Sequence, residues 1–140
     1  MMIIVFLTLQ AISLLSFQPV EAQQEIIRER KITYLSVDEF NYRFYSEVYA
    51  FIIDARSKAE YKSGRIGGAL NVSNRKDLDQ MADTLDHETP LYLYCTAKTR
   101  SSAAAEHLKE LGFVNLYVLD SGMKGWKEAD LPVEKKSKRK

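Results

Sequence analysis

Short apolar runs alternate with helical patterns along most of the sequence. Ala50–Asp54, Leu91–Tyr94 and Asn115–Asp120 are the clearest runs, and Ile32–Leu35 and Ala69–Val72 are shorter ones. In the clearest runs, polar residues do not alternate with the apolar ones, which is typical of strands buried on both faces, as in a parallel sheet. The alternation predicts a single α/β domain, with a small, mainly parallel β-sheet flanked by helices on both faces.

Helix starts are marked by capping boxes, in which a Ser and a Glu three residues later cap the same turn. Residues 36–39 and 57–60 both have this form. Before Pro90, apolar residues at spacings of three and four predict an amphipathic helix; they are Leu78, Met81, Ala82 and Leu85. Residues 103–108 favour a further helix, which Gly112 ends.

The N-terminal residues have the pattern of a secretory signal peptide. Ile3–Phe17 is apolar but short for a membrane span, which needs about 20 apolar residues. Val20-Glu21-Ala22 then offers a cleavage site before Gln23. We therefore expect export to the periplasm or the extracellular space, with no membrane span once the leader is cleaved. An uncleaved anchor is the alternative, because no Lys or Arg precedes the apolar run.

These patterns divide the chain into four parts. Residues 1–22 form the expected signal peptide, residues 23–30 a polar N-terminal segment, and residues 31–133 the folded domain. Residues 134–140 form a basic tail with nothing apolar to bury, for which we expect disorder.

Composition excludes several classes of function. With 20 basic and 19 acidic residues, the formal net charge is +1, so nothing indicates a nucleic-acid partner. A single cysteine excludes an internal disulfide. Two histidines and one cysteine are too few for a typical zinc site, so we expect neither a metal nor a cofactor.

The single cysteine, Cys95, lies where an apolar strand gives way to a polar loop and then to a helix. In this arrangement, loop N–H groups, the helix dipole and a nearby Arg stabilise a thiolate. We predict Cys95 as a nucleophile and the following loop as an anion-binding site, composed of Thr96, Ala97, Lys98, Thr99 and Arg100. The alternative is a cysteine that only packs in the core; the polar, basic residues that follow it favour the nucleophile.

Several motifs, in order, resemble the rhodanese domains. They begin with residues 51–56 (FIIDAR) and 68–71 (GALN), continue with 93–101 (LYCTAKTRS), and end with 119–122 (LDSG) and Trp126. The resemblance runs from about Tyr34 to Val133, which is nearly all of the expected domain.

The resemblance implies a sulfurtransferase. Cys95 would take a sulfane sulfur from a small anionic donor such as thiosulfate and pass it on from a persulfide. The acceptor, a thiol or cyanide, would come from outside, because the chain has no second cysteine. The family's substrate loop falls on residues 96–100. Its Asp and Arg pair falls on Asp54 and Arg56, which we interpret as structural support of the loop.

Three positions depart from the family's usual pattern. Lys98 stands where many members have Gly, Arg65 replaces a frequent His, and Ser121 replaces the first of two glycines. If the loop keeps a left-handed conformation at Lys98, that residue carries roughly 1–2 kcal/mol of strain. An ammonium group beside the anionic donor would then compensate for the strain.

Two other functions remain as alternatives. One is a catalytically silent rhodanese-type module that binds a partner protein. The other is a phosphatase or arsenate reductase on the same fold, which uses five residues between Cys and Arg. Here only four residues lie between Cys95 and Arg100, and Ser101 occupies the phosphatase position for Arg. Neither His87 nor His107 is assigned as a base.

Overall fold

The computed structural model describes residues 30–135. The expected signal peptide, most of the polar N-terminal segment and residues 136–140 of the basic tail lie outside this range. Five strands form the sheet: β1 (Lys31–Leu35), β2 (Phe51–Asp54), β3 (Leu70–Asn71), β4 (Leu91–Tyr94) and β5 (Asn115–Leu119). Five helices accompany them: α2 (Val37–Ser46), α3 (Lys58–Ser63), α4 (Arg75–Ala82), α5 (Thr99–Glu110) and α6 (Gly122–Glu128).

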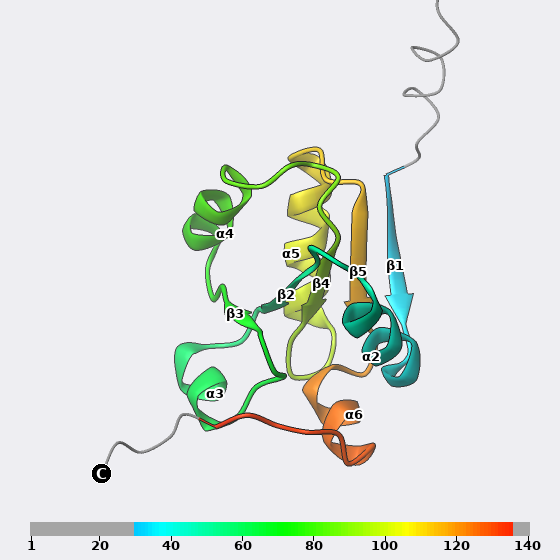
Figure 1. Ribbon diagram of the computed structural model, residues 1–140. Coiled ribbons are helices and arrows are strands. Elements are labelled where there is room, and N and C mark those ends of the chain that lie inside the picture. The colour runs from blue at the N-terminus through cyan, green and yellow to red at the C-terminus, as the bar shows by residue number, and fades with distance from the viewer. Residues whose placement is uncertain (1–29, 136–140) are drawn as a thin grey trace, which may run out of the picture.

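All strands run parallel, in the order β1-β5-β4-β2-β3 (Figure 1). Strand β4 is central: Leu93 lies in register with Ile53 of β2 on one side and with Val118 of β5 on the other. Every residue of β4 is fully buried, which explains why this run is apolar without alternation. The predicted single α/β domain with a parallel sheet is confirmed.

The helices cover both faces of the sheet. Because side chains alternate along a strand, Leu91 and Leu93 pack with residues of α4 and α5 on one face. Tyr92 and Tyr94 pack on the other face, with residues of α2 and α6. On that face, the ring of Phe40 meets Tyr92 edge to face, with centroids 5.3 Å apart. Two apolar layers therefore fix β4 from both sides.

Both predicted capping boxes form. The Ser36 hydroxyl accepts the Glu39 N–H at the start of α2, and the Ser57 hydroxyl accepts the Glu60 N–H at the start of α3. Gly112 follows α5 with φ of 108°, a left-handed value that Gly adopts readily. The capping boxes and Gly112 therefore predict these helix ends correctly.

Asp54 and Arg56 form a buried ion pair at the carboxyl end of β2. The Arg56 guanidinium donates to both carboxylate oxygens of Asp54, from Nε at 2.9 and 3.1 Å and from Nη2 at 2.6 Å, and Nη2 also donates to the Gly64 carbonyl. The Tyr94 hydroxyl donates to Asp54 at 2.6 Å and accepts the Ile66 N–H at 3.1 Å. Burial and the Asp54 charge raise the pKa of Tyr94 well above its usual range. Every member is satisfied, so the network ties the 64–66 loop to the central strands.

The folded domain extends one residue beyond its predicted end. Glu134, expected in the tail, forms an antiparallel bridge with Arg65 through two backbone hydrogen bonds of 2.9 and 2.8 Å. No apolar pattern predicts this contact, because Glu134 joins the fold through its backbone and through an ion pair of 3.9 Å with Arg65. Within residues 30–135, no helix is both long and apolar enough to span a membrane.

Replacing Tyr94 with Phe tests the buried network. Loss of the hydroxyl leaves the Ile66 N–H without its partner inside the fold, so we expect the free energy of unfolding to fall by about 1–3 kcal/mol. Urea unfolding measures the change. Tyr117→Phe is the matched control: it keeps the ring stacked on Tyr92 and should change stability by less than about 0.5 kcal/mol. Equal effects of the two variants would contradict a structural role for the Tyr94 hydroxyl.

Candidate active site

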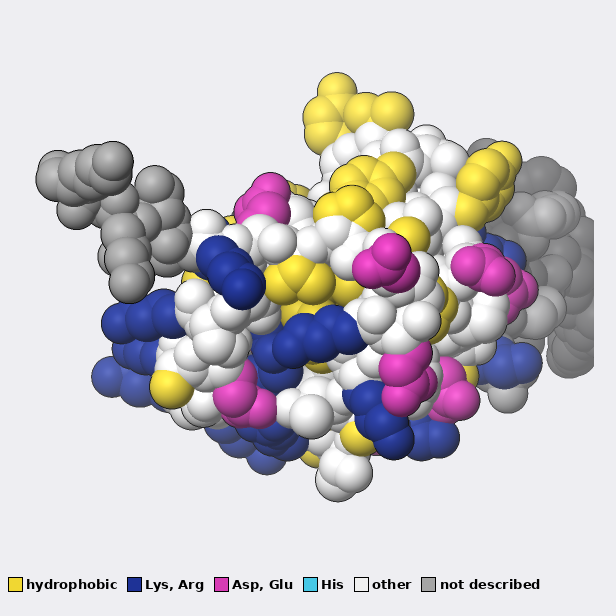
Figure 2. Space-filling model, turned by 90° about the horizontal axis from the view of Figure 1, so that it is seen from below, with side chains coloured by type: hydrophobic (Ala, Val, Ile, Leu, Met, Phe, Trp, Pro, Cys, Tyr) yellow, Lys and Arg dark blue, Asp and Glu magenta, His cyan; other side chains and the backbone are white. Residues whose placement is uncertain are grey.

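Cys95 lies at the carboxyl end of the central strand, where ligands bind in open parallel sheets. It follows β4 directly, and the loop of residues 96–98 leads from it into α5. Its residue surface is 2% exposed. Figure 2 shows the surface at this end of the sheet, where basic and acidic side chains are interspersed. Its position at the strand end agrees with the sequence prediction.

Helix α6 sets the direction of the loop's carbonyl groups. The Met123 N–H donates to the Cys95 carbonyl at 2.8 Å, and the Lys124 N–H donates to the Thr96 carbonyl at 3.1 Å. Gly122 permits this approach: it has φ of 58°, and a Cβ there would lie 2.2 Å from the Ala97 carbonyl oxygen. No other residue fits at this position without moving the loop.

The opposite edge of the loop presents free N–H groups. In a trans peptide, the C=O of one residue and the N–H of the next point in opposite directions. Because the carbonyls of residues 95–97 face α6, the N–H groups of residues 96–98 point away from it. Among the described residues, no acceptor pairs with any backbone N–H from Thr96 to Ser101. Six successive donors thus have no acceptor in this part of the chain, and that they bind an anion stays a prediction.

Among the described residues, the sulfur of Cys95 has one hydrogen-bond partner. The Ser101 hydroxyl lies 3.4 Å from Sγ and 2.9 Å from the Lys98 carbonyl oxygen. A hydroxyl has one proton, so it donates to one of these acceptors at a time. Ser101 is fully buried in the first turn of α5. The Ser101 hydroxyl can therefore stabilise a negative charge on the sulfur from a position that solvent does not reach.

Arg100 is held by a carboxylate. Its guanidinium donates to both oxygens of Glu60, at 2.7 and 2.9 Å, and to the Thr96 hydroxyl at 2.7 Å. The Thr96 hydroxyl donates in turn to Glu60 at 2.7 Å. These bonds, above all those from Arg100, hold the pKa of Glu60 well below its usual range, and the same contact raises the pKa of Arg100. Much of the positive charge expected from Arg100 is therefore offset by Glu60.

Lys98 differs from the sequence expectation in two ways. Its φ is −147°, outside the left-handed region, so the expected strain is absent. Its ammonium donates to Asp120 at 2.8 Å and lies 5.7 Å from the centre of the Tyr34 ring. The bond to Asp120 raises the pKa of Lys98. The loop therefore accommodates Lys98 without backbone strain, and the Lys98 side chain turns toward Asp120 at the end of β5.

The other two departures from the family pattern, Arg65 and Ser121, make side-chain contacts with other residues than Cys95. Arg65 stacks over the Tyr61 ring at 4.7 Å and joins the bridge to Glu134. Ser121 precedes α6, and its side chain fills the space that a Cβ on Gly125 would need. Within residues 30–135, no cluster of three His, Cys, Asp or Glu side chains could hold a metal ion.

Sequence reasoning missed two residues of the site. The capping box predicts only a helix-capping role for Glu60, but its carboxylate also joins the start of α3 to Thr96 and Arg100. Ser101 was considered only as the residue that replaces a phosphatase Arg. Its place in the first turn of α5 offered a signal, because that turn faces the preceding strand end.

The comparisons with known proteins agree with this geometry. A family model described as the rhodanese-like domain matches residues 36–129. The chain therefore belongs to the rhodanese-like domain family. Thiosulfate sulfurtransferase GlpE of Shewanella oneidensis is 35% identical over 79 residues, covering 56% of this chain and 77% of that protein.

Solved structures give the same fold. The polysulfide-sulfur transferase homodimer of Wolinella succinogenes matches with a TM-score of 0.64 and 25% identity, covering 87% of this chain and 92% of that one. A thiosulfate sulfurtransferase of Pseudomonas aeruginosa matches with a TM-score of 0.66 and 26% identity over 86% of this chain. This chain spans 22% of the Pseudomonas protein.

Replacing Glu60 with Gln tests the link between α3 and the loop. Gln keeps the shape but loses the charge opposite Arg100, so we expect the free energy of unfolding at pH 7 to fall by about 1 kcal/mol, as for a well-formed, partly exposed pair. Chemical unfolding checks this. Glu128→Gln is the control, because Glu128 is exposed and its ion pair with Lys124 is long, at 4.0 Å. This variant should change the free energy of unfolding by less than about 0.5 kcal/mol.

The same pair predicts a pH dependence. The pKa of Glu60 is lower in the folded chain than its usual value of about 4.3. The stabilisation of the fold by ionised Glu60 is therefore complete at neutral pH. It declines as the pH falls from the usual pKa toward the lowered pKa of the folded chain. The stability difference between the parent and Glu60→Gln should be constant from about pH 7 to 5 and shrink below about pH 4. A difference that grows on acidification would contradict the assignment.

Proposed function

We propose that this protein is a rhodanese-type sulfurtransferase that moves a sulfane sulfur through a persulfide on Cys95. One observation carries the proposal: the only cysteine lies at the end of the central strand, beside successive backbone N–H groups that have no acceptor among the described residues. The family membership and the relatives named as thiosulfate sulfurtransferases support the same class of reaction. Neither a metal nor a cofactor takes part in the proposed steps.

In the first step, the Cys95 thiolate attacks the outer sulfur of a donor such as thiosulfate. A bond forms between Sγ and that sulfur, the S–S bond of thiosulfate breaks, and sulfite leaves with the electron pair. The charge is −3 on both sides: thiosulfate and thiolate become sulfite and an anionic persulfide. The loop N–H groups stabilise this charge, because they are fixed by the backbone and need no reorientation.

In the second step, an acceptor takes the outer sulfur. Cyanide or an external thiolate attacks it, the bond to Sγ breaks, and the electron pair returns to Cys95 as thiolate. The chain offers no second cysteine to intercept the persulfide. Donation from the Ser101 hydroxyl, 3.4 Å from Sγ, stabilises the returning charge. Lys98 and Arg100 contribute less charge than expected from the sequence, because both are paired with carboxylates.

The alternatives fit the geometry less well. A phosphatase needs a free guanidinium over its loop, but Ser101 holds the corresponding position and Arg100 is engaged by Glu60. A catalytically silent module gives no reason for a thiol among free N–H donors. It would nevertheless keep the same fold, so persulfide formation is the deciding measurement.

We also propose export, from the apolar run and the Val20-Glu21-Ala22 tripeptide. The mature chain would begin at Gln23, seven residues before the described domain.

Thiosulfate treatment followed by mass spectrometry tests the proposed reaction. The intact protein should gain one sulfur atom, mapped to the peptide that contains Cys95, and cyanide should remove it and yield thiocyanate. Cys95→Ser should abolish both gain and turnover while changing stability by less than about 1 kcal/mol, because the side chains have nearly the same shape. Parent protein alkylated at Cys95 serves as the control. Thiocyanate formation by Cys95→Ser above the uncatalysed background would refute the mechanism.

N-terminal sequencing tests export. Protein recovered from the exported fraction of expressing cells should begin at Gln23. Ala22→Tyr places a bulky residue at the cleavage position and should leave the leader attached. Full-length parent protein that stays in the cytoplasmic fraction would contradict the proposal.

A further inference from the structure

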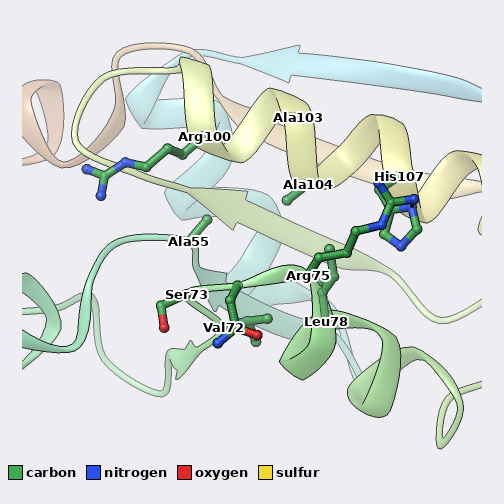
Figure 3. A pocket seen from close by; sticks show the side chains of 10 residues that line it. Ala55, Val72, Ser73, Arg75, Leu78, Arg100, Ala103, Ala104 and His107 are labelled. Carbon is green, nitrogen blue, oxygen red and sulfur yellow. Dashed lines mark hydrogen bonds between the residues drawn. The ribbon is translucent and has the colours of Figure 1, made fainter.

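A cavity of about 280 Å³ lies beside the loop of Cys95, between α4 and α5. Figure 3 shows the side chains that line it, with Arg100 at one end and the Arg75–His107 pair at the other. The middle is apolar: Ala104 and Ala103 from α5 and Val72 and Leu78 from the α4 side contribute to it. Thiosulfate needs no such apolar space, so the reaction as described so far does not use it.

The cavity is adjacent to the nucleophile. Arg100 belongs both to the cavity wall and to the loop that follows Cys95. Ala55, another wall residue, donates its N–H to the carbonyl of Tyr94, the residue before Cys95. Arg100 and His107 are seven residues apart on α5, a rise of about 10 Å. Cys95 itself does not line the cavity, so a small organic molecule held at the far end has to extend past Arg100 and Ala55 to meet the sulfur.

The far end carries the guanidinium of Arg75, which makes no direct ion pair among the described residues, while the carboxylates of Glu110 and Asp79 both flank its partner His107. The Arg75 guanidinium donates to His107 Nδ1 at 2.8 Å, and His107 Nε2 lies 2.5 Å from Asp79. A guanidinium only donates, so Nδ1 is the acceptor in the contact with Arg75. Among the described residues, no carboxylate pairs with Arg75 directly, in contrast to Arg100. The lining of the cavity includes no acidic side chain.

We propose that this cavity binds the sulfur acceptor, and that the acceptor is a thiol with an apolar chain and a carboxylate. The carboxylate pairs with Arg75, the chain lies against Leu78 and Ala104, and the thiolate reaches the Cys95 persulfide. It attacks the outer sulfur, the bond from that sulfur to Sγ breaks, and the products are an acceptor persulfide and the Cys95 thiolate. The proposal rests on the proposed sulfurtransferase function for its chemistry, but the binding site does not depend on turnover.

A binding measurement isolates the site from the reaction. The probes are 6-(methylthio)hexanoate, which cannot accept sulfur, and 6-(methylthio)hexanol, its uncharged counterpart. Titration followed by NMR should show that the carboxylate binds the parent at least about fivefold more tightly, the effect expected of one charge-assisted contact. Shifts should centre on the methyl groups of Leu78 and Ala104. Equal affinity for the two probes would overturn the proposal.

Variants connect the preference to Arg75. In Arg75→Gln, the preference for the carboxylate should fall to about twofold or less, while Arg75→Lys should keep part of it. Lys76→Gln is the matched control, since it removes a neighbouring charge of α4 that does not line the cavity. Ala104→Leu fills the apolar middle and should weaken both probes. Loss of preference in Lys76→Gln as well would show a general charge effect and refute the site.

Kinetics then test whether the site serves transfer. With thiosulfate as donor, we expect the parent to favour 6-mercaptohexanoate over 6-mercaptohexanol in kcat/KM, and Arg75→Gln to reduce this ratio about fivefold or more. An unchanged ratio would overturn the acceptor assignment. Absence of turnover with both thiols and with cyanide would instead refute the proposed function, and the binding result would still decide whether the cavity takes a carboxylate.

Discussion

Two hydrogen bonds from the start of α6 determine which side of the Cys95 loop faces a ligand. They hold the carbonyls of Cys95 and Thr96, and the planarity of the peptide then directs the following N–H groups the other way. The donors cost no reorientation when an anion arrives, since the fold has already fixed them. This arrangement requires glycine at position 122, because a Cβ there would clash with the carbonyl oxygens of the loop.

Electrostatic pairing gives the site a different character from the one its composition suggests. Lys98 and Arg100 are both close to the nucleophile in sequence, yet each donates to a carboxylate from another part of the chain, Asp120 and Glu60. The donors of the site that have no acceptor among the described residues are therefore the backbone N–H groups of the loop and not these two side chains. Arg75, which makes no direct ion pair among the described residues, lies farther away across the apolar cavity, where in our proposal it selects among organic molecules.

The sequence predicted what depends on local patterns. The apolar run of residues 91–94, the two capping boxes and the position of Cys95 at a strand end follow from spacing and burial alone, and all are present in the structure. What it missed depends on contacts between distant segments. The bond from Arg100 to Glu60 joins residues that are forty positions apart. The Lys98 ammonium likewise binds Asp120, which lies in a later part of the chain. Glu134 joins the fold through its backbone, which no side-chain pattern records.

The order of elements along the chain has a consequence for biosynthesis. Helix α6, which orients the loop, is made after Cys95 and after the helix that follows it. A nascent chain that has already released α5 from the ribosome still lacks the partners of the loop carbonyls. The Cys95 thiol therefore acquires its oriented loop N–H groups only when synthesis of the domain is nearly finished, so partial translation products contain Cys95 without the contacts that orient its loop.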